Sequence, residues 1–334
     1  MVKIIADSTC DLSKELIEKY DIDILPLYIH LGEQEYKDGE EVTPTEIFQW
    51  CEEQKKPPKT SAPSAEDVKK ILEPYKKEER EVIIFTISSE FSSTYQVVNL
   101  MVEEMEYEEQ AFVVDSKNLS TGIGLLVLHA AQMAQEGKGA REIVSVVEAL
   151  KPYVRASFVV DTLKYLHRGG RCSATAALAG GIFKVKPKIY VEHGKMDAGK
   201  KYRGTTEHVT MQYVEDMEKE LKKARDEYVF LTHSGCSQEV VEQVRSYLEG
   251  LQHFKNIYIA EAGGVISSHC GPGTLGVMFV EKERNYGPYD GDFDLNQNGI
   301  MEEDEKASEA AYIRHLAEKE SESEDYEEDS QEDF

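Results

Sequence analysis

Hydroxyl side chains gather in two segments that each lie just before an expected helix. The first segment is Thr60-Ser61-Ala62-Pro63-Ser64, and the second is Ser88-Ser89-Glu90-Phe91-Ser92-Ser93-Thr94-Tyr95. Hydroxyl groups and free backbone N–H groups converge at a helix N-terminus, where the helix dipole also favours an anion. Either segment alone is typical of an ordinary helix cap. Together they indicate a site for a carboxylate or a phosphate.

Apolar strand signals alternate with helix signals through the first half of the chain. The expected strands are Val2–Asp7, Val82–Ile87 and Phe112–Asp115, and the expected helices are 93–105, 122–135 and 140–150. This order favours a parallel sheet covered by helices on both faces. Ligands of such sheets bind at the carboxyl ends of the strands. Those ends carry Asp7-Ser8-Thr9, Ser88-Ser89 and Asp115-Ser116, so we expect hydroxyl groups to meet at one sheet edge.

The pattern changes after Pro152. A long amphipathic helix is expected at about Glu207–Lys223, and the expected strands lie at 157–160, 188–191, 228–232, 257–261 and 275–280. These elements predict a second α/β domain with a mixed sheet. We therefore expect two α/β domains, residues 1–155 and 156–281, followed by an acidic extension at 282–334. A small hairpin insertion, at about residues 23–56, is expected where Ile24–Leu31 and Gln34–Tyr36 flank Gly32-Glu33.

The charge of the chain is strongly acidic and unevenly distributed. The net charge is −26 over 334 residues, and Glu281–Phe334 holds 20 acidic and 5 basic residues. This balance argues against nucleic acid as a partner, because phosphate binding needs clustered Lys and Arg. It also limits any contact with anionic membranes to a transient one. No apolar run approaches the ~20 residues of a membrane span, and the N-terminus does not resemble a signal peptide, so we expect a cytoplasmic protein.

The cysteines suggest neither a disulfide framework nor a zinc site. They are odd in number, scattered, and never spaced as CxxC: Cys10, Cys51, Cys172, Cys236 and Cys270.

Five motifs, in this order, resemble those of the DegV family of bacterial lipid-binding proteins over roughly residues 1–280. The family carries TSxPS, an SSxxSGTY-like motif, a strand ending in VDS, DTLxYLxRGGRxS and HxGPGxLG. The matching segments here are Thr60–Ser64, Ser88–Tyr95, Val114–Ser116, Asp161–Ser173 and His269–Gly276. Two positions depart from the family pattern. Ser93 replaces the glycine of the second motif, and Ala62 replaces a frequent glutamine of the first.

The resemblance implies that a long-chain fatty acid lies in an apolar tunnel between the two domains. Its carboxylate would be held by Thr60 and Ser92, with Ser61 and Ser93 beside them. No catalytic cofactor is implied. Family members present the acid to a separate fatty acid kinase, which makes an acyl phosphate, so the chain itself is not expected to be an enzyme.

Three further residues match positions of the family that lie near the acid head or on the partner surface: His269, Arg171 and Arg203. Ordinary structural roles remain open for two of them, since His269 could satisfy a loop and Arg171 could form an ion pair. A different function also remains open. Ser92 with His269 would suit a serine-dependent hydrolase or acyl transferase.

The acidic extension contains a twelve-residue segment that fits the EF-hand calcium loop. A calcium-dependent interaction module is therefore a third alternative. No entering helix precedes the loop, because Gly287-Pro288 would break it, and no second loop pairs with it. The expected oxygen ligands are Asp294, Asn296, Asn298, the Ile300 carbonyl, Glu302 and Glu305.

Overall fold

A computed structural model describes residues 1–172 and 185–282, and Met1–Lys282 form one compact unit. The expected calcium ligands, residues 294–305, lie outside the described residues. Within these, no helix is both long and apolar enough to cross a membrane.

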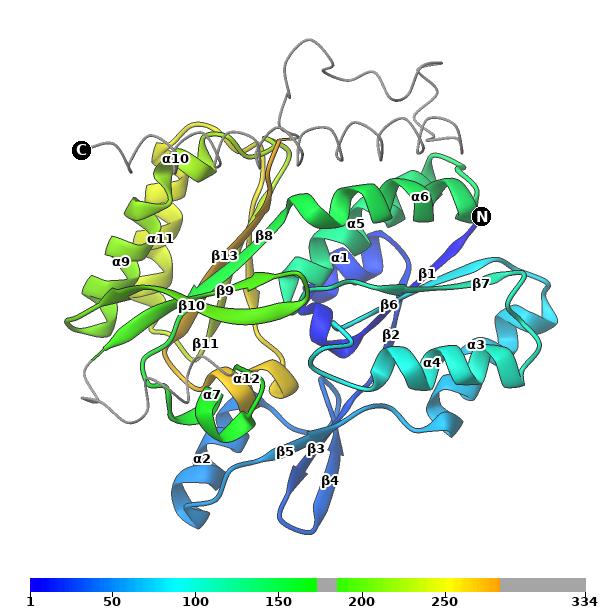
Figure 1. Cartoon of the computed structure of the whole chain (residues 1–334), viewed down its shortest axis with the longest axis horizontal. Helices are drawn as coiled ribbons and strands as arrows, with labels where there is room; N and C mark the ends of the chain where they lie inside the picture. Colours follow the sequence, from blue (N-terminus) through cyan, green and yellow to red (C-terminus); the bar gives the residue numbers. More distant parts are fainter. Residues whose placement is uncertain (173–184, 283–334) are drawn as a thin grey trace, which may run out of the picture. The chain divides into compact units, whose positions relative to one another are not determined.

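The first lobe contains the expected parallel sheet, in the strand order β2-β1-β6-β7. Alternate residues of its central strands enter different cores, because successive side chains point to opposite faces. Ile4 packs with α5 and α6, whereas Ile5 packs with α3 and α4, and Figure 1 shows these helix pairs on the two sides of the sheet. The strands are β1 (Lys3–Asp7), β2 (Ile22–Leu25), β6 (Val82–Thr86) and β7 (Ala111–Asp115). The helices are α1 (Lys14–Lys19), α3 (Ala65–Lys77), α4 (Thr94–Glu104), α5 (Thr121–Gln135) and α6 (Ala140–Leu150), with the 3-10 turn η1 (Ser8–Cys10) after β1.

The insertion is an antiparallel sheet of three strands rather than a simple hairpin. Its order is β4-β3-β5, with β3 (Tyr28–Leu31), β4 (Gln34–Lys37), β5 (Lys59–Ser61) and the helix α2 (Pro44–Gln54). The prediction of one continuous strand at Ile24–Leu31 is wrong, because the segment contains parts of two strands. Pro26 lies between β2 and β3, and β2 belongs to the parallel sheet of the first lobe. A capping box of Thr43 and Glu46 forms the start of α2.

The second lobe contains a mixed sheet, in the order β10-β9-β8-β13-β11-β12, in which only β11 and β12 pair in parallel. Its strands are β8 (Val154–Val159), β9 (Lys186–Glu192), β10 (Lys195–Tyr202), β11 (Val229–Ser234), β12 (Ile257–Glu261) and β13 (Thr274–Val280). Strand β10 was not expected, since KMDAGKKY lacks apolar alternation. The single helix expected at 207–223 is also wrong. It is divided at Met217 (φ −87°, ψ 0°) into α9 (Thr206–Asp216) and α10 (Glu218–Leu221).

One core joins the two lobes. Helices α9 and α11 (Gln238–Gly250) cover one face of the second sheet, where Val277 and Phe279 of β13 pack. Met278 points to the other face and packs in the same core as the first-lobe residues Ile4 and Ile123. Two short helices, α7 (Lys164–Gly169) and α12 (Gly264–Cys270), contact each other, and α12 also contacts α2, β3 and β5. These two helices carry Leu166, Gly169, Val265, Ile266 and His269.

Candidate functional site

The two hydroxyl segments meet in one hollow, which we call the polar hollow. It encloses about 540 Å³ and is lined from both lobes. Six of the seven ligand-binding residues expected from the sequence line it: Thr60, Ser61, Ser92, Ser93, Arg171 and His269. The seventh, Arg203, lies in a separate surface hollow beside Lys200 and Lys201. The polar hollow therefore gathers residues that are distant in the sequence, such as Thr60 and His269, which are 209 positions apart.

Thr60 and His269 form the closest polar contact between the lobes in this hollow. Thr60 Oγ1 lies 2.8 Å from Nε2 of His269. Burial lowers the pKa of His269 to about 4, and the positive charge of Arg171 acts in the same direction. The imidazole is therefore neutral at neutral pH. Its buried Nδ1 has no hydrogen-bond partner among residues 1–172 and 185–282.

Ser61, the neighbour of Thr60, directs its hydroxyl elsewhere. Ser61 Oγ lies 2.9 Å from Nε2 of His30. Because successive side chains of a strand point to opposite faces, Thr60 and Ser61 cannot both face His269. Of this pair, Thr60 is the hydroxyl available to a ligand beside His269.

Gly169 packs directly against the unpartnered side of His269. A Cβ atom at this position would lie 2.5 Å from Nδ1 of His269. We expect Gly169→Ala to displace the imidazole and break its contact with Thr60, at a cost of roughly 1–3 kcal/mol in unfolding free energy. Urea unfolding together with the imidazole NMR signals of His269 would test this. Gly250→Ala is the control, because nothing lies within 4 Å of a Cβ there; equal effects of both variants would contradict the prediction.

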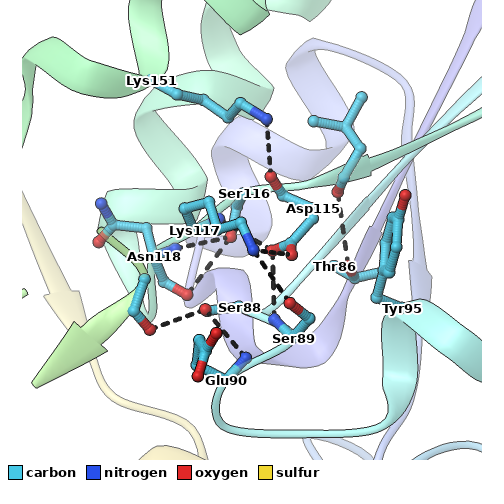
Figure 2. A network of polar contacts seen from close by, with 12 residues as sticks. Thr86, Ser88, Ser89, Glu90, Tyr95, Asp115, Ser116, Lys117, Asn118 and Lys151 are labelled. Carbon is cyan, nitrogen blue, oxygen red and sulfur yellow. Dashed lines mark hydrogen bonds and ion pairs between the residues drawn. The ribbon is translucent and has the colours of Figure 1, made fainter. Parts of the chain in front are cut away.

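The segment that carries Ser92 is fixed by a network at the carboxyl ends of β6 and β7 (Figure 2). Ser89 N donates to Asp115 Oδ1 at 3.2 Å, and Lys117 Nζ lies 2.8 Å from Asp115 Oδ2. Ser88 N donates to the Asn118 carbonyl. Burial would raise the pKa of Asp115, but the hydrogen bonds from Lys117 and Ser89 hold it below its ordinary value. The charged carboxylate therefore holds this loop in place.

The same loop is tied to the second lobe. Ser88 Oγ donates to the Gly194 carbonyl at 2.8 Å, and Gly194 lies in the turn between β9 and β10. Arg171 adds hydrogen bonds to the carbonyls of Gly169 at 2.7 Å and Phe91 at 3.4 Å. Within the described part of the chain, Arg171 forms these backbone hydrogen bonds and not the ion pair considered from the sequence.

Ser92 and Ser93 lie at the start of α4. Ser92 Oγ lies 2.8 Å from Oγ1 of Thr94 and accepts a hydrogen bond from Thr94 N. Among the described residues, Ser92 Oγ forms no hydrogen bond with His269, so the Ser92–His269 pair needed by a serine hydrolase is not formed. Ser93 has φ −81° and ψ 6°. Since φ is negative, the serine that replaces the family glycine causes no backbone strain there.

A second, apolar hollow adjoins the polar one. It encloses about 50 Å³ and is lined mainly by apolar residues such as Phe158, Leu166 and Met278. The two hollows share four lining residues: Leu119, Met196, Ile266 and His269. A long alkyl chain needs a larger volume than this. Met196 and Met278 have flexible side chains, whose rearrangement can enlarge the hollow. The arrangement is a hydroxyl-lined hollow that lies against an apolar one, with the four shared residues between them.

Sequence reasoning missed several residues of the site. Met196 lies on the unexpected strand β10, and Val265 and Ile266 lie on the unexpected helix α12. The available signal was the apolar pair Val265-Ile266 one turn before His269. The spacing GxGxxG at Gly271–Gly276 is not a dinucleotide site, because it runs from the end of α12 into β13 rather than from a strand into a helix.

Proteins of known sequence and structure resemble this chain over most of its length. A DegV domain-containing protein of Caldanaerobacter subterraneus is 33% identical over 281 residues, which are 84% of this chain and 99% of that protein. The structure of a fatty-acid-binding DegV protein from Thermus thermophilus superposes with a TM-score of 0.78 at 30% identity, over 84% of this chain and 99% of that one. A stearic acid-binding protein from Eubacterium ventriosum gives a TM-score of 0.74 at 29% identity, with the same coverage. The model of the DegV family, described as uncharacterised, matches residues 1–282, and the chain therefore belongs to the DegV family.

Proposed function

We propose that this chain binds a long-chain fatty acid, with the carboxylate on Thr60 and Ser92 and the alkyl chain in the apolar hollow. The observation that carries the proposal is the junction of the two hollows at Leu119, Met196, Ile266 and His269. An amphiphilic ligand fits this junction because its polar and apolar parts meet different linings. The names of the relatives from Thermus and Eubacterium, which refer to fatty acid binding, support the same ligand class.

The neutral imidazole of His269 prepares Thr60 to donate. If Nε2–H donates to Thr60 Oγ1 across the 2.8 Å contact, the proton of the Thr60 hydroxyl is free for a carboxylate oxygen. In this tautomer Nδ1 carries a lone pair and no proton, so its lack of a partner among the described residues leaves no buried N–H unsatisfied. Ser92 supplies a second hydroxyl from the start of α4, where the helix dipole favours an anion.

The energetics favour an acyl chain over a small anion. Each buried methylene contributes about 0.8 kcal/mol, so sixteen carbons contribute on the order of 10 kcal/mol before the costs of association. Burying a carboxylate costs several kcal/mol unless it is hydrogen-bonded, and the Thr60 and Ser92 hydroxyls reduce that cost. A phosphate would satisfy the polar hollow but leave the apolar one unused.

We further propose that the bound acid is passed to a separate fatty acid kinase. The family resemblance supports this step, as does the sequence, which contains no GxxxxGK[ST] phosphate-binding loop. In this role the chain carries the substrate and performs no chemistry. A kinase from the same host and ATP should then convert the bound acid to an acyl phosphate, which hydroxylamine would trap.

Native mass spectrometry of the full chain, purified without added lipid, tests the binding proposal. We expect one bound molecule per chain, released on denaturation with the mass of a fatty acid of about sixteen to eighteen carbons. Titration of delipidated chain with palmitate is the complementary measurement. A chain that carries no acid and shows no saturable binding of palmitate would contradict the proposal.

A further inference from the structure

Three buried aspartates lie beside the two hollows without lining either of them. Asp7, Asp11 and Asp38 are 0%, 7% and 2% exposed. None of them takes part in an ion pair with the described residues. Burial raises the pKa of each, to about 6 for Asp7 and well above the ordinary range for Asp11. Burying a carboxyl group without a neighbouring cation costs free energy unless hydrogen bonds compensate for it. The hydrogen-bond partners of these three groups therefore indicate what the groups do.

Two of these carboxyl groups bind the first turn of α12. Asp38 Oδ1 accepts from Gly264 N at 2.8 Å and from Val265 N at 3.2 Å, while its Oδ2 accepts from Ser8 Oγ. Asp11 Oδ1 accepts from Gly263 N at 2.9 Å. Three successive amides of the second lobe are therefore held by side chains from the first lobe and its insertion.

The glycines at this end of α12 make the close approach possible. A Cβ at Gly264 would lie 2.5 Å from Cδ1 of Ile29 and 3.1 Å from Asp38 Oδ1, and a Cβ at Gly263 would lie 3.1 Å from Asp11 Oδ1. The backbone at the start of α12 thus fits against both carboxyl groups and β3 with no space for a side chain.

Helix α12 carries three residues that line the polar hollow. The amide of Val265 is itself held, Ile266 follows it directly, and His269 lies near the other end of this seven-residue helix. A helix is rigid over such a length, because its backbone hydrogen bonds repeat at every turn. Fixing its first turn therefore fixes the position of the imidazole relative to Thr60.

We propose that Asp11 and Asp38 are positioning residues of the polar hollow, which hold α12 against the first lobe and thereby keep His269 in contact with Thr60. This inference rests on the proposed function for its link to fatty acid binding. Neither carboxyl group lines either hollow. Each acts on the ligand site through the backbone of α12.

Two substitutions of Asp38 distinguish a role in positioning His269 from a role in the stability of the fold alone. Asp38→Asn retains an oxygen that accepts from Gly264 and Val265, whereas Asp38→Ala removes it. In the ligand-free full chain, we expect Asp38→Ala to shift the imidazole ¹⁵N resonances of His269, assigned with His269→Gln, and Asp38→Asn to leave them near those of the wild type. We expect palmitate affinity to fall by about tenfold or more in Asp38→Ala and to recover to within about threefold in Asp38→Asn.

Asp216→Ala is the matched control, because Asp216 accepts hydrogen bonds from Tyr202 and Lys200 away from both hollows. It should leave the His269 resonances and the affinity unchanged. Unmoved His269 resonances in folded Asp38→Ala would overturn the inference. Should Asp38→Ala not fold, Asp11→Ala frees the Gly263 amide and the Ser120 hydroxyl and must shift the same resonances. Wild-type chain that binds no palmitate would contradict the proposed function alone, since the resonances of ligand-free chain still decide the positioning role.

Discussion

Replacing both Thr60 and Ser92 with alanine is expected to lower the affinity for palmitate by about 100-fold or more while the chain stays folded. A hydrogen bond to a charged group contributes about 1.5–3 kcal/mol, and each factor of ten in affinity corresponds to 1.4 kcal/mol. The double variant removes two such donors and leaves the carboxylate of the ligand with fewer partners. Isothermal titration with palmitate measures the loss, and circular dichroism checks the fold.

Ser61→Ala is the control for this experiment. Its hydroxyl contacts His30 rather than His269, so its removal should leave the affinity for palmitate close to that of the wild type. If the folded double variant kept the lipid load of the wild type, or if Ser61→Ala lost as much affinity, the assignment of the carboxylate to Thr60 and Ser92 would be wrong.

The second large effect is expected from blocking the junction of the two hollows, which under the proposed function is the passage for the alkyl chain. Ile266 lines both of them and is partly exposed, so Ile266→Trp should place an indole ring in the passage without overpacking the deep core. In the wild type, each added methylene of the acid should improve the binding free energy by about 0.8 kcal/mol. In Ile266→Trp that improvement should end at a short chain length, and the affinity for palmitate should fall by about 100-fold or more.

A series of saturated acids from eight to eighteen carbons, titrated into both proteins, tests this prediction. Ile266→Val is the control, since it keeps an apolar side chain and opens the passage slightly. An unchanged dependence on chain length in Ile266→Trp would show that the alkyl chain does not pass Ile266, and would remove the apolar hollow from the proposal.

The sheet edge that holds the site could be predicted because the strands of this sheet have apolar sequences typical of a buried parallel sheet. Strands β1 and β6 are buried at every position, and such continuous apolar runs indicate parallel strands covered on both faces. Hydroxyl residues that follow those strands are then placed at one edge by topology alone. The loop from Ser88 to Ser93 lies where this argument puts it.

The second-lobe side of the site could not be predicted in this way. Strand β10 is rich in lysine and has no apolar alternation, because it lies at the edge of its sheet. Helix α12 spans only seven residues, Gly264–Cys270, which is too short for a helical period to show. His269 was singled out by family resemblance, and its contact with Thr60 depends on a fold that brings together residues 209 positions apart. Periodicity in the sequence carries no information about such a contact.

The core that runs through both lobes has a consequence for the thermodynamics of the whole chain. Met278 of the second sheet packs in the same core as Ile4 of the first, and the cavity walls come from both sides of that seam. An alkyl ligand would therefore add apolar contacts between the two lobes. Its binding free energy would add to the free energy of unfolding of the lobes together. Neither lobe alone contains a complete binding surface. The lipid-loaded chain should therefore release its ligand and unfold both lobes in one cooperative transition.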